Sequence, residues 1–92
     1  MVFRYDYSDS VKEMLKHLHK KDKKTYGIVL KKIEEISSRD KITIEYYKNL
    51  RNDLSDYKRV HVSKSFVLMF RVFKKEEFIL FERLVHHDEA YK

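Results

Sequence analysis

Cysteine is absent from the 92 residues of this chain. A disulfide framework and a thiolate metal site are therefore excluded, and the fold must be stabilised by packing. Long hydrophobic runs are absent as well: no segment approaches the length of a membrane span, and the initial MVFRYDYSDS lacks the apolar stretch of a signal peptide. These absences predict a cytoplasmic protein that does not contact a membrane.

The length of the chain predicts one domain, which we expect to span residues 1–92. Hydrophobic residues make up 42% of the sequence and include seven Tyr and six Phe, which is enough for a packed core although 39% of the residues are charged. The composition therefore predicts a folded chain rather than an intrinsically disordered one.

Positive charge is in excess and is evenly spread. Lys and Arg outnumber Asp and Glu by 21 to 15, and residues 1–40 and 41–92 each contribute half of the net charge of +6. Such a balance suits a polyanion such as RNA, or an acidic protein partner. Because no separate basic tail exists, binding to nucleic acid would have to use the folded surface.

The first part of the chain predicts a strand followed by two helices. Residues 2–7 alternate with a period of two, which is typical of a strand with one aromatic face. Ser10 and Glu13 form a capping-box pattern, and the apolar spacing behind them predicts a helix over about residues 10–21. Asp22 can cap a second helix, which we expect to end at SSRD. The two apolar stripes consist of Val11, Met14, Leu15 and Leu18, then Tyr26, Val29, Leu30, Ile33 and Ile36.

The second part of the chain predicts a sheet. Residues 41–56 fit neither period throughout, so we expect an irregular segment with a possible short helix. Strands are predicted at 57–62, 66–73 and 77–85, and the short polar turns between them require antiparallel neighbours. The middle strand is apolar on both faces and should be central. The order βααβββ predicts an α+β fold, an antiparallel sheet of about four strands with an N-terminal helical hairpin on one face.

Strand alternation assigns the polar residues of this sheet to its two faces. It places Arg59 and His61 on the face that the hairpin leaves open, and Lys58 on the other face with the core valines. Cations on the open face would suit phosphates. In the last strand either Glu82 or Arg83 should reach the open face, but not both.

The terminal RLVHHDEAYK carries further titratable groups. A turn of helix there would set His87 and Tyr91 on one side, at positions i and i+4. Imidazole exchanges protons near neutral pH, and a phenol can donate a proton or orient a substrate. RNA carries its own nucleophile, the ribose 2′-hydroxyl, so such groups beside cations can cleave it without a metal. Metal binding by HHD is disfavoured because adjacent side chains diverge and no second ligand group has suitable spacing.

The segment DYKRVHVSKSFVLMFRVFKKEEFILFERLVHHDEAYK resembles the second half of RelE/ParE-superfamily toxins. The similarity is closest to the RelE and YafQ branch of mRNA interferases and to its archaeal members. It covers about residues 46–92 by motif, and the earlier strand and helices by order only. The most telling motifs are KRVHV on one strand, the apolar FVLMFRV after it, and a terminal His with an aromatic residue four positions later.

The resemblance implies a compact toxin that cleaves mRNA on the ribosome and is silenced by a cognate RelB-like antitoxin wrapped around it. It places catalytic histidines at His61 and His87, and the terminal aromatic residue at Tyr91. YafQ-type members have a further His where this chain has Lys48, and an acidic residue where it has Ser65. These departures leave the division of acid and base roles open.

Our first hypothesis is therefore a metal-independent endoribonuclease without a cofactor. His61 and His87 act as base and acid in an unassigned order, Tyr91 orients the substrate or a proton, and Arg59 stabilises the phosphate. The partners are the ribosome, mRNA and a short acidic antitoxin, through which alone we expect oligomers to form. The alternatives are a non-catalytic ParE-like inhibitor of DNA gyrase and an inert remnant that only binds its antitoxin. Further candidates for phosphate binding are Lys48, Lys58, Lys64 and Arg83.

Overall fold

A computed structural model describes residues 2–49 and 57–90 of the chain. The segment in which we predicted an irregular region therefore lies only partly within it, and residues 50–56 fall outside. The elements, in chain order, are β1 (Arg4–Tyr7), α1 (Asp9–Lys21), α2 (Lys23–Ser37), the 3₁₀-helix η1 (Thr43–Tyr46), β2 (Lys48–Asn49), β3 (Tyr57–Val62), β4 (Phe66–Phe73), β5 (Phe78–His86) and α3 (His87–Ala90).

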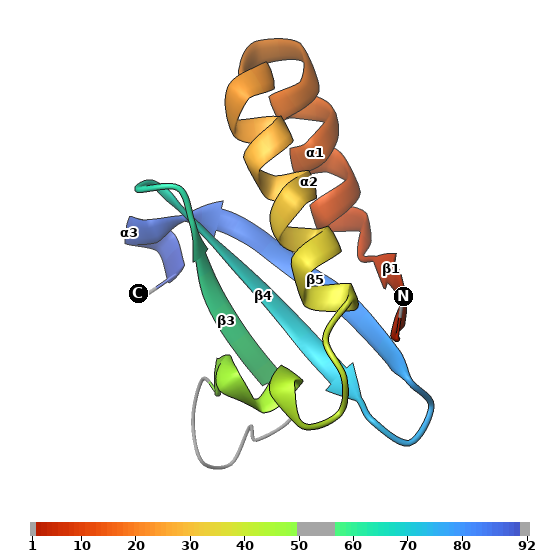
Figure 1. Cartoon of the computed structure of the whole chain (residues 1–92). Helices are drawn as coiled ribbons and strands as arrows, with labels where there is room; N and C mark the ends of the chain where they lie inside the picture. Colours follow the sequence, from red (N-terminus) through yellow and green to blue (C-terminus); the bar gives the residue numbers. More distant parts are fainter. Residues whose placement is uncertain (1, 50–56, 91–92) are drawn as a thin grey trace.

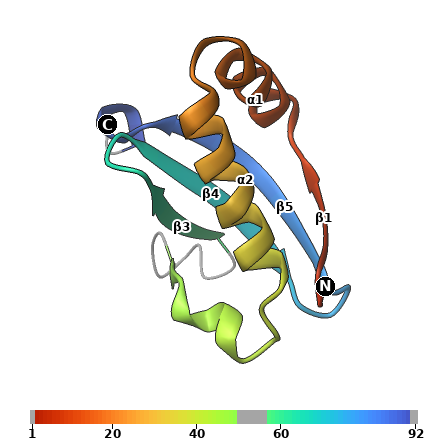
Figure 2. The same ribbon diagram turned by 45° about the horizontal axis from the view of Figure 1, so that its top comes forward.

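Two layers make up the molecule, a sheet and the α1–α2 hairpin that covers one of its faces (Figure 1). The strands lie in the order β1-β5-β4-β3-β2, so β4 is central as predicted. Figure 2 shows α2 crossing in front of β4 and β5. The predicted α+β class is confirmed, and the face of the sheet turned away from the hairpin is called the open face below. None of the helices in the described part of the chain is long and apolar enough to cross a bilayer.

The sheet differs from the predicted one in two respects. It has five strands instead of about four, because the two-residue β2 pairs with β3. It is also mixed, since β1 runs parallel to β5 while the other pairs are antiparallel. Only a short link forces neighbouring strands to be antiparallel, and no short link joins the first strand to the last.

The helix starts depend on single side chains. Ser8 caps α1, because its Oγ accepts a hydrogen bond from the amide of Val11 at 3.2 Å. The predicted capping box at Ser10 is therefore wrong, and the helix begins slightly earlier than expected. Asp22 caps α2 as predicted, accepting hydrogen bonds from the amide of Thr25 at 3.1 Å and from its hydroxyl at 2.7 Å. The cap fixes the tight turn of the hairpin.

Strand β4 is buried on both of its faces. Its residues Leu68 and Phe70 belong to the core between the sheet and the hairpin. Val67 and Met69 alternate with them and so face the other way, yet they are only 0% and 4% exposed. A rigid apolar strand therefore underlies the middle of the open face, where the candidate site lies.

Candidate active site

The register of the four neighbouring strands β2, β3, β4 and β5 builds a row of cations across the open face. Residues that pair directly on neighbouring strands point to the same face of a sheet. Lys48 pairs with Arg59, Arg59 with Met69, and Met69 with Arg83. Lys48 and Arg59 therefore lie side by side, and Arg83 follows on the other side of the buried Met69. We call these three residues the cationic row.

Two histidines meet beside this row. His61 follows Arg59 on the same face of β3, and His87 is the first residue of α3. The two rings stack, with centroids 5.3 Å apart and an angle of 28° between their planes. His61 is exposed, and the side chain of His87 is 49% exposed, so a ligand can reach both. The two histidines of our hypothesis therefore lie next to each other.

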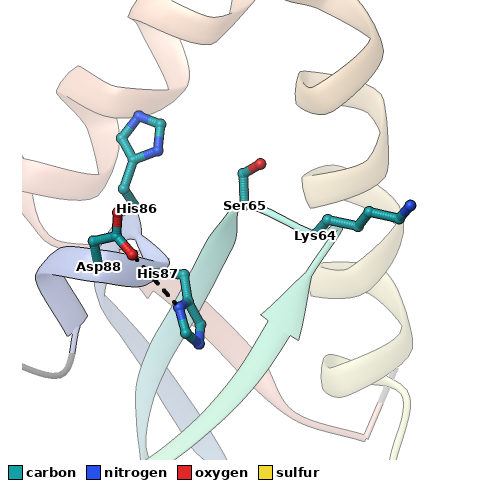
Figure 3. A pocket seen from close by; sticks show the side chains of 5 residues that line it. All are labelled: Lys64, Ser65, His86, His87 and Asp88. Atoms are coloured by element: carbon teal, nitrogen blue, oxygen red, sulfur yellow. Dashed lines mark ion pairs between the residues drawn. The ribbon is translucent and has the colours of Figure 1, made fainter.

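Contacts with the β3–β4 turn fix the position of His87. Its backbone amide donates a hydrogen bond to the carbonyl of Ser65 at 2.7 Å, which ties the start of α3 to that turn. The turn contains Ser63 in the left-handed region, with φ of 60°. The Nδ1 atom of His87 lies 3.9 Å from the carboxylate of Asp88. Figure 3 shows the polar hollow of about 220 Å³ at this point, which is lined by Lys64, Ser65, His86, His87 and Asp88.

Two neighbours of His87 have different surroundings. His86 packs against Phe66, with ring centroids 4.5 Å apart. Lys64 lines the hollow, but its side chain extends away from His87 (Figure 3). It therefore lies at the rim and not beside the imidazoles.

Lys58 does not belong to the site. Its side chain is 2% exposed on the hairpin side of the sheet, where Nζ lies 2.8 Å from the carboxylate of Glu45 and 2.8 Å from the amide oxygen of Asn49. The predicted role of Lys58 in phosphate binding is wrong, because strand alternation turns it away from the open face. Its hydrogen bond, followed by that of Lys74, lowers the pKa of Glu45 against the opposing effect of burial.

A β-bulge in β5 places two successive charged residues on the open face. Met69 pairs with Arg83, but the next residue of β4, Phe70, pairs with Phe81, which leaves Glu82 as the extra residue. A bulge locally breaks the alternation of side chains. The prediction that only one of Glu82 and Arg83 reaches this face is therefore wrong, and regular alternation gave no signal of the bulge.

The bulge brings Glu82 into contact with two residues that the sequence did not single out together. The carboxylate of Glu82 lies 3.9 Å from the guanidinium of Arg71 and near the hydroxyl of Tyr57. That guanidinium lies over the Tyr57 ring, 5.3 Å from its centroid. Burial is the largest cause that raises the pKa of Tyr57 to about 12, and the nearby Glu82 is the next. Arg71 and Arg83 lower this pKa. We call Tyr57, Arg71 and Glu82 the Tyr57 cluster.

Comparison with known proteins places the chain in a family. No family model matches it. It is 41% identical over 91 residues to the candidate toxin RelE4 of Methanocaldococcus jannaschii, an alignment that covers 99% of this chain and 93% of the relative. The chain belongs to the RelE toxin family. The RelE resemblance of its second half is thereby confirmed, and it extends over the first half as well.

Solved structures share the fold of this RelE-family chain. The YoeB–YefM complex from Staphylococcus aureus contains a chain with a TM-score of 0.72 and 16% identity, covering 92% of this chain and 97% of that one. The E. coli DinJ–YafQ complex contains one with a TM-score of 0.64 and 15% identity, covering 98% and 99%. At such identities the likeness concerns the fold alone.

Tyr91, the last predicted site residue of this RelE-family chain, lies outside the described residues. The helical turn expected there begins as α3, which has His87 at its start. The role predicted for Tyr91 remains a prediction, as does metal independence.

Proposed function

We propose that this protein is the toxin of a toxin–antitoxin pair in the cytoplasm, and that it cleaves mRNA on the ribosome without a metal. The observation that carries the proposal is the stack of His61 and His87 beside the cationic row. Membership of the RelE toxin family supports it independently. Two titratable rings and three cations on one face are the groups that this reaction needs.

The reaction begins at the ribose. One imidazole, in its neutral form, removes the proton of the 2′-hydroxyl, and the 2′-oxygen attacks the adjacent phosphorus. The bond from phosphorus to the 5′-oxygen breaks, and the other imidazole, in its protonated form, gives its proton to that oxygen. The products are a 2′,3′-cyclic phosphate and a 5′-hydroxyl. An imidazole can accept or donate a proton, so the same type of side chain can serve in both roles.

The cationic row stabilises the phosphate in this reaction. Arg59 lies next to His61 on the same face of β3, so its charge opposes the negative charge that develops on the phosphoryl oxygens. Lys48 lies beside it on β2, Arg83 lies beyond Met69 on β5, and both hold the neighbouring RNA backbone. The ribosome supplies much of the orientation of the substrate, which is why a small chain with few acid and base groups suffices.

An acidic antitoxin completes the proposal. The solved YoeB and YafQ chains each belong to a complex with a partner, YefM and DinJ respectively. The net charge of +6 of this chain suits a short acidic, RelB-like partner whose charges meet the open face. We expect co-expression of such a partner to suppress toxicity, and an isolated gene to speak against the pairing.

Primer extension on a message under translation in vitro tests the activity. We expect wild-type protein to cut within ribosome-bound codons, and both His61→Ala and His87→Ala to cleave about a thousandfold more slowly, the loss typical of a missing acid or base. His86→Ala is the matched control, because this adjacent imidazole packs on Phe66 and should leave the rate unchanged. An intact message together with stalled replication would support the gyrase inhibitor instead. If neither cleavage nor stalled replication is seen, the inert remnant is supported.

A further inference from the structure

We infer that the Tyr57 cluster is a nucleobase subsite, which stacks the base of a nucleotide next to the cleaved bond and selects bases that carry an amino group. The inference rests on the proposed function, because it assigns a part of the same RNA to a second part of the open face. It concerns Tyr57, Arg71 and Glu82, none of which takes part in the proposed chemistry.

The place of the cluster is set by the register of the sheet. Tyr57, Arg59 and His61 lie on one face of β3, and Tyr57 pairs directly with Arg71. Alternate residues of a strand are about 7 Å apart, so the cluster forms the next row of side chains beyond the cationic row. An RNA strand whose scissile phosphate lies between Arg59 and the histidines therefore brings a neighbouring base over Tyr57 and Arg71.

Arg71 provides a flat surface for that base. Its guanidinium lies over the ring of Tyr57, and its side chain remains 41% exposed. Single-stranded RNA is recognised by stacking of its bases on aromatic rings and on arginine planes. Because the Arg71 guanidinium is paired with Glu82 and lies over the Tyr57 ring, the plane is held in place before a ligand arrives.

Glu82 provides the selectivity. It is the only acidic residue in the strands β2 to β5, and it lies beside cations on a face that is proposed to bind a polyanion. A carboxylate repels phosphate but accepts hydrogen bonds from the amino groups of adenine, cytosine and guanine. Uracil presents a carbonyl oxygen at the corresponding position. The subsite should therefore disfavour uracil.

The selectivity is tested on the RNA first, so that no variant has to fold. Messages are prepared that differ in the base just before the cut and in the base just after it, and they are placed on ribosomes. Single-turnover cleavage by wild-type protein is then followed by primer extension. At one of these positions we expect uracil to slow cleavage or raise KM about tenfold, the size of one lost stacked and hydrogen-bonded base. Equal rates for all bases at every position would overturn the inference while leaving the ribonuclease proposal intact.

Two variants then separate a binding role from a structural one. Glu82→Gln can donate as well as accept a hydrogen bond, so we expect the preference against uracil to shrink or reverse, which a merely structural residue would not cause. Arg71→Lys keeps the charge and loses the plane, and should raise KM about tenfold with kcat unchanged. The matched control is Arg4→Lys, since Arg4 lies over the Phe78 ring at the far edge of the sheet.

The outcomes are distinct from those of the histidine variants. If the wild-type protein cuts no message, the proposed function fails and this inference with it. If cleavage requires His61 and His87 but base preference is the same in wild type and Glu82→Gln, only the inference fails. A thermal unfolding midpoint close to that of wild type confirms that each variant is folded.

Discussion

The two faces of strand β3 place their charges in different surroundings. On the hairpin side Lys58 is 2% exposed, and its ammonium group is surrounded by Glu45, the side chain of Asn49 and, at 3.4 Å, the carbonyl of Tyr47. On the open side the next residue, Arg59, stands in a row of cations. A buried charge must be compensated by its surroundings, whereas the charges of the open face lie next to the proposed site.

The contacts on the hairpin side hold the fold, and those on the open side serve the site. The ion pair of Lys58 with Glu45 joins β3 to η1, and the hydrogen bond of Lys58 to Asn49 joins β3 to β2. The next residue before Asn49 is Lys48, a member of the cationic row. The buried ion pair therefore positions one end of the open-face site from behind, and the two faces can be tested separately.

Among the variants that compare the two faces of β3, removal of the central cation should have the largest effect. Arg59→Ala is expected to slow cleavage by a factor of about 100, as is typical when one group that stabilises a developing charge is lost. Its effect on the free energy of unfolding should be small, because the residue lies on the ligand side of the strand. Single-turnover cleavage and urea denaturation measure the two quantities. A large loss of stability with an unchanged cleavage rate would show that Arg59 serves the fold and not the site.

Loss of Glu45 should have the next largest effect, this time on stability. Glu45→Ala leaves the ammonium of Lys58 buried without its carboxylate, which we expect to cost about 2 kcal/mol, less than for a fully buried pair because Glu45 is half exposed. Lys58→Met is the counterpart and should cost about 1 kcal/mol or less, since it removes the buried charge and leaves Glu45 its ion pair with Lys74 at 3.1 Å.

Urea denaturation of both variants and of the double variant measures this asymmetry. If Lys58→Met costs more than Glu45→Ala, the methylene chain of Lys58 matters more than the compensation of its charge. Cleavage by Lys58→Met also matters: a rate close to that of wild type would show that β2 keeps Lys48 in place through backbone pairing alone.

Much of this fold could be predicted because the spacing of apolar residues in its helices and strands follows the regular helical and strand periods. The strands β3, β4 and β5 and both helices of the hairpin were found at or within a residue of their ends. Periodicity failed where a tertiary contact decides the structure. The two residues of β2 have no period to detect, and the pairing of β1 beside β5 joins the two ends of the described chain.

The site could be predicted to the same extent. His61 was placed by strand alternation, and His87 by its position after the last strand and by family resemblance. The Tyr57 cluster could not be predicted, because it depends on a bulge that shifts the register by one residue at Met69 and Phe70. Lys58 was assigned to the correct face by alternation, and the error lay in giving a residue of the core face a role on the open face.

The smallest expected effect concerns acidity, and it again separates the two faces. The hydrogen bond from Lys58 lowers the pKa of Glu45 in the folded protein, so Glu45 binds its proton less readily there than in the unfolded chain. Its ionised form therefore contributes stability at neutral pH, and this contribution is lost as the pH falls through the ordinary glutamate value of 4.5 and below it. In Glu45→Gln that part of the pH dependence should be absent, so its stability and that of wild type should converge in acid. Urea denaturation between neutral and acidic pH measures the difference. A constant gap between the two proteins would mean that Glu45 stabilises the chain by packing, and not by compensating the charge behind the site.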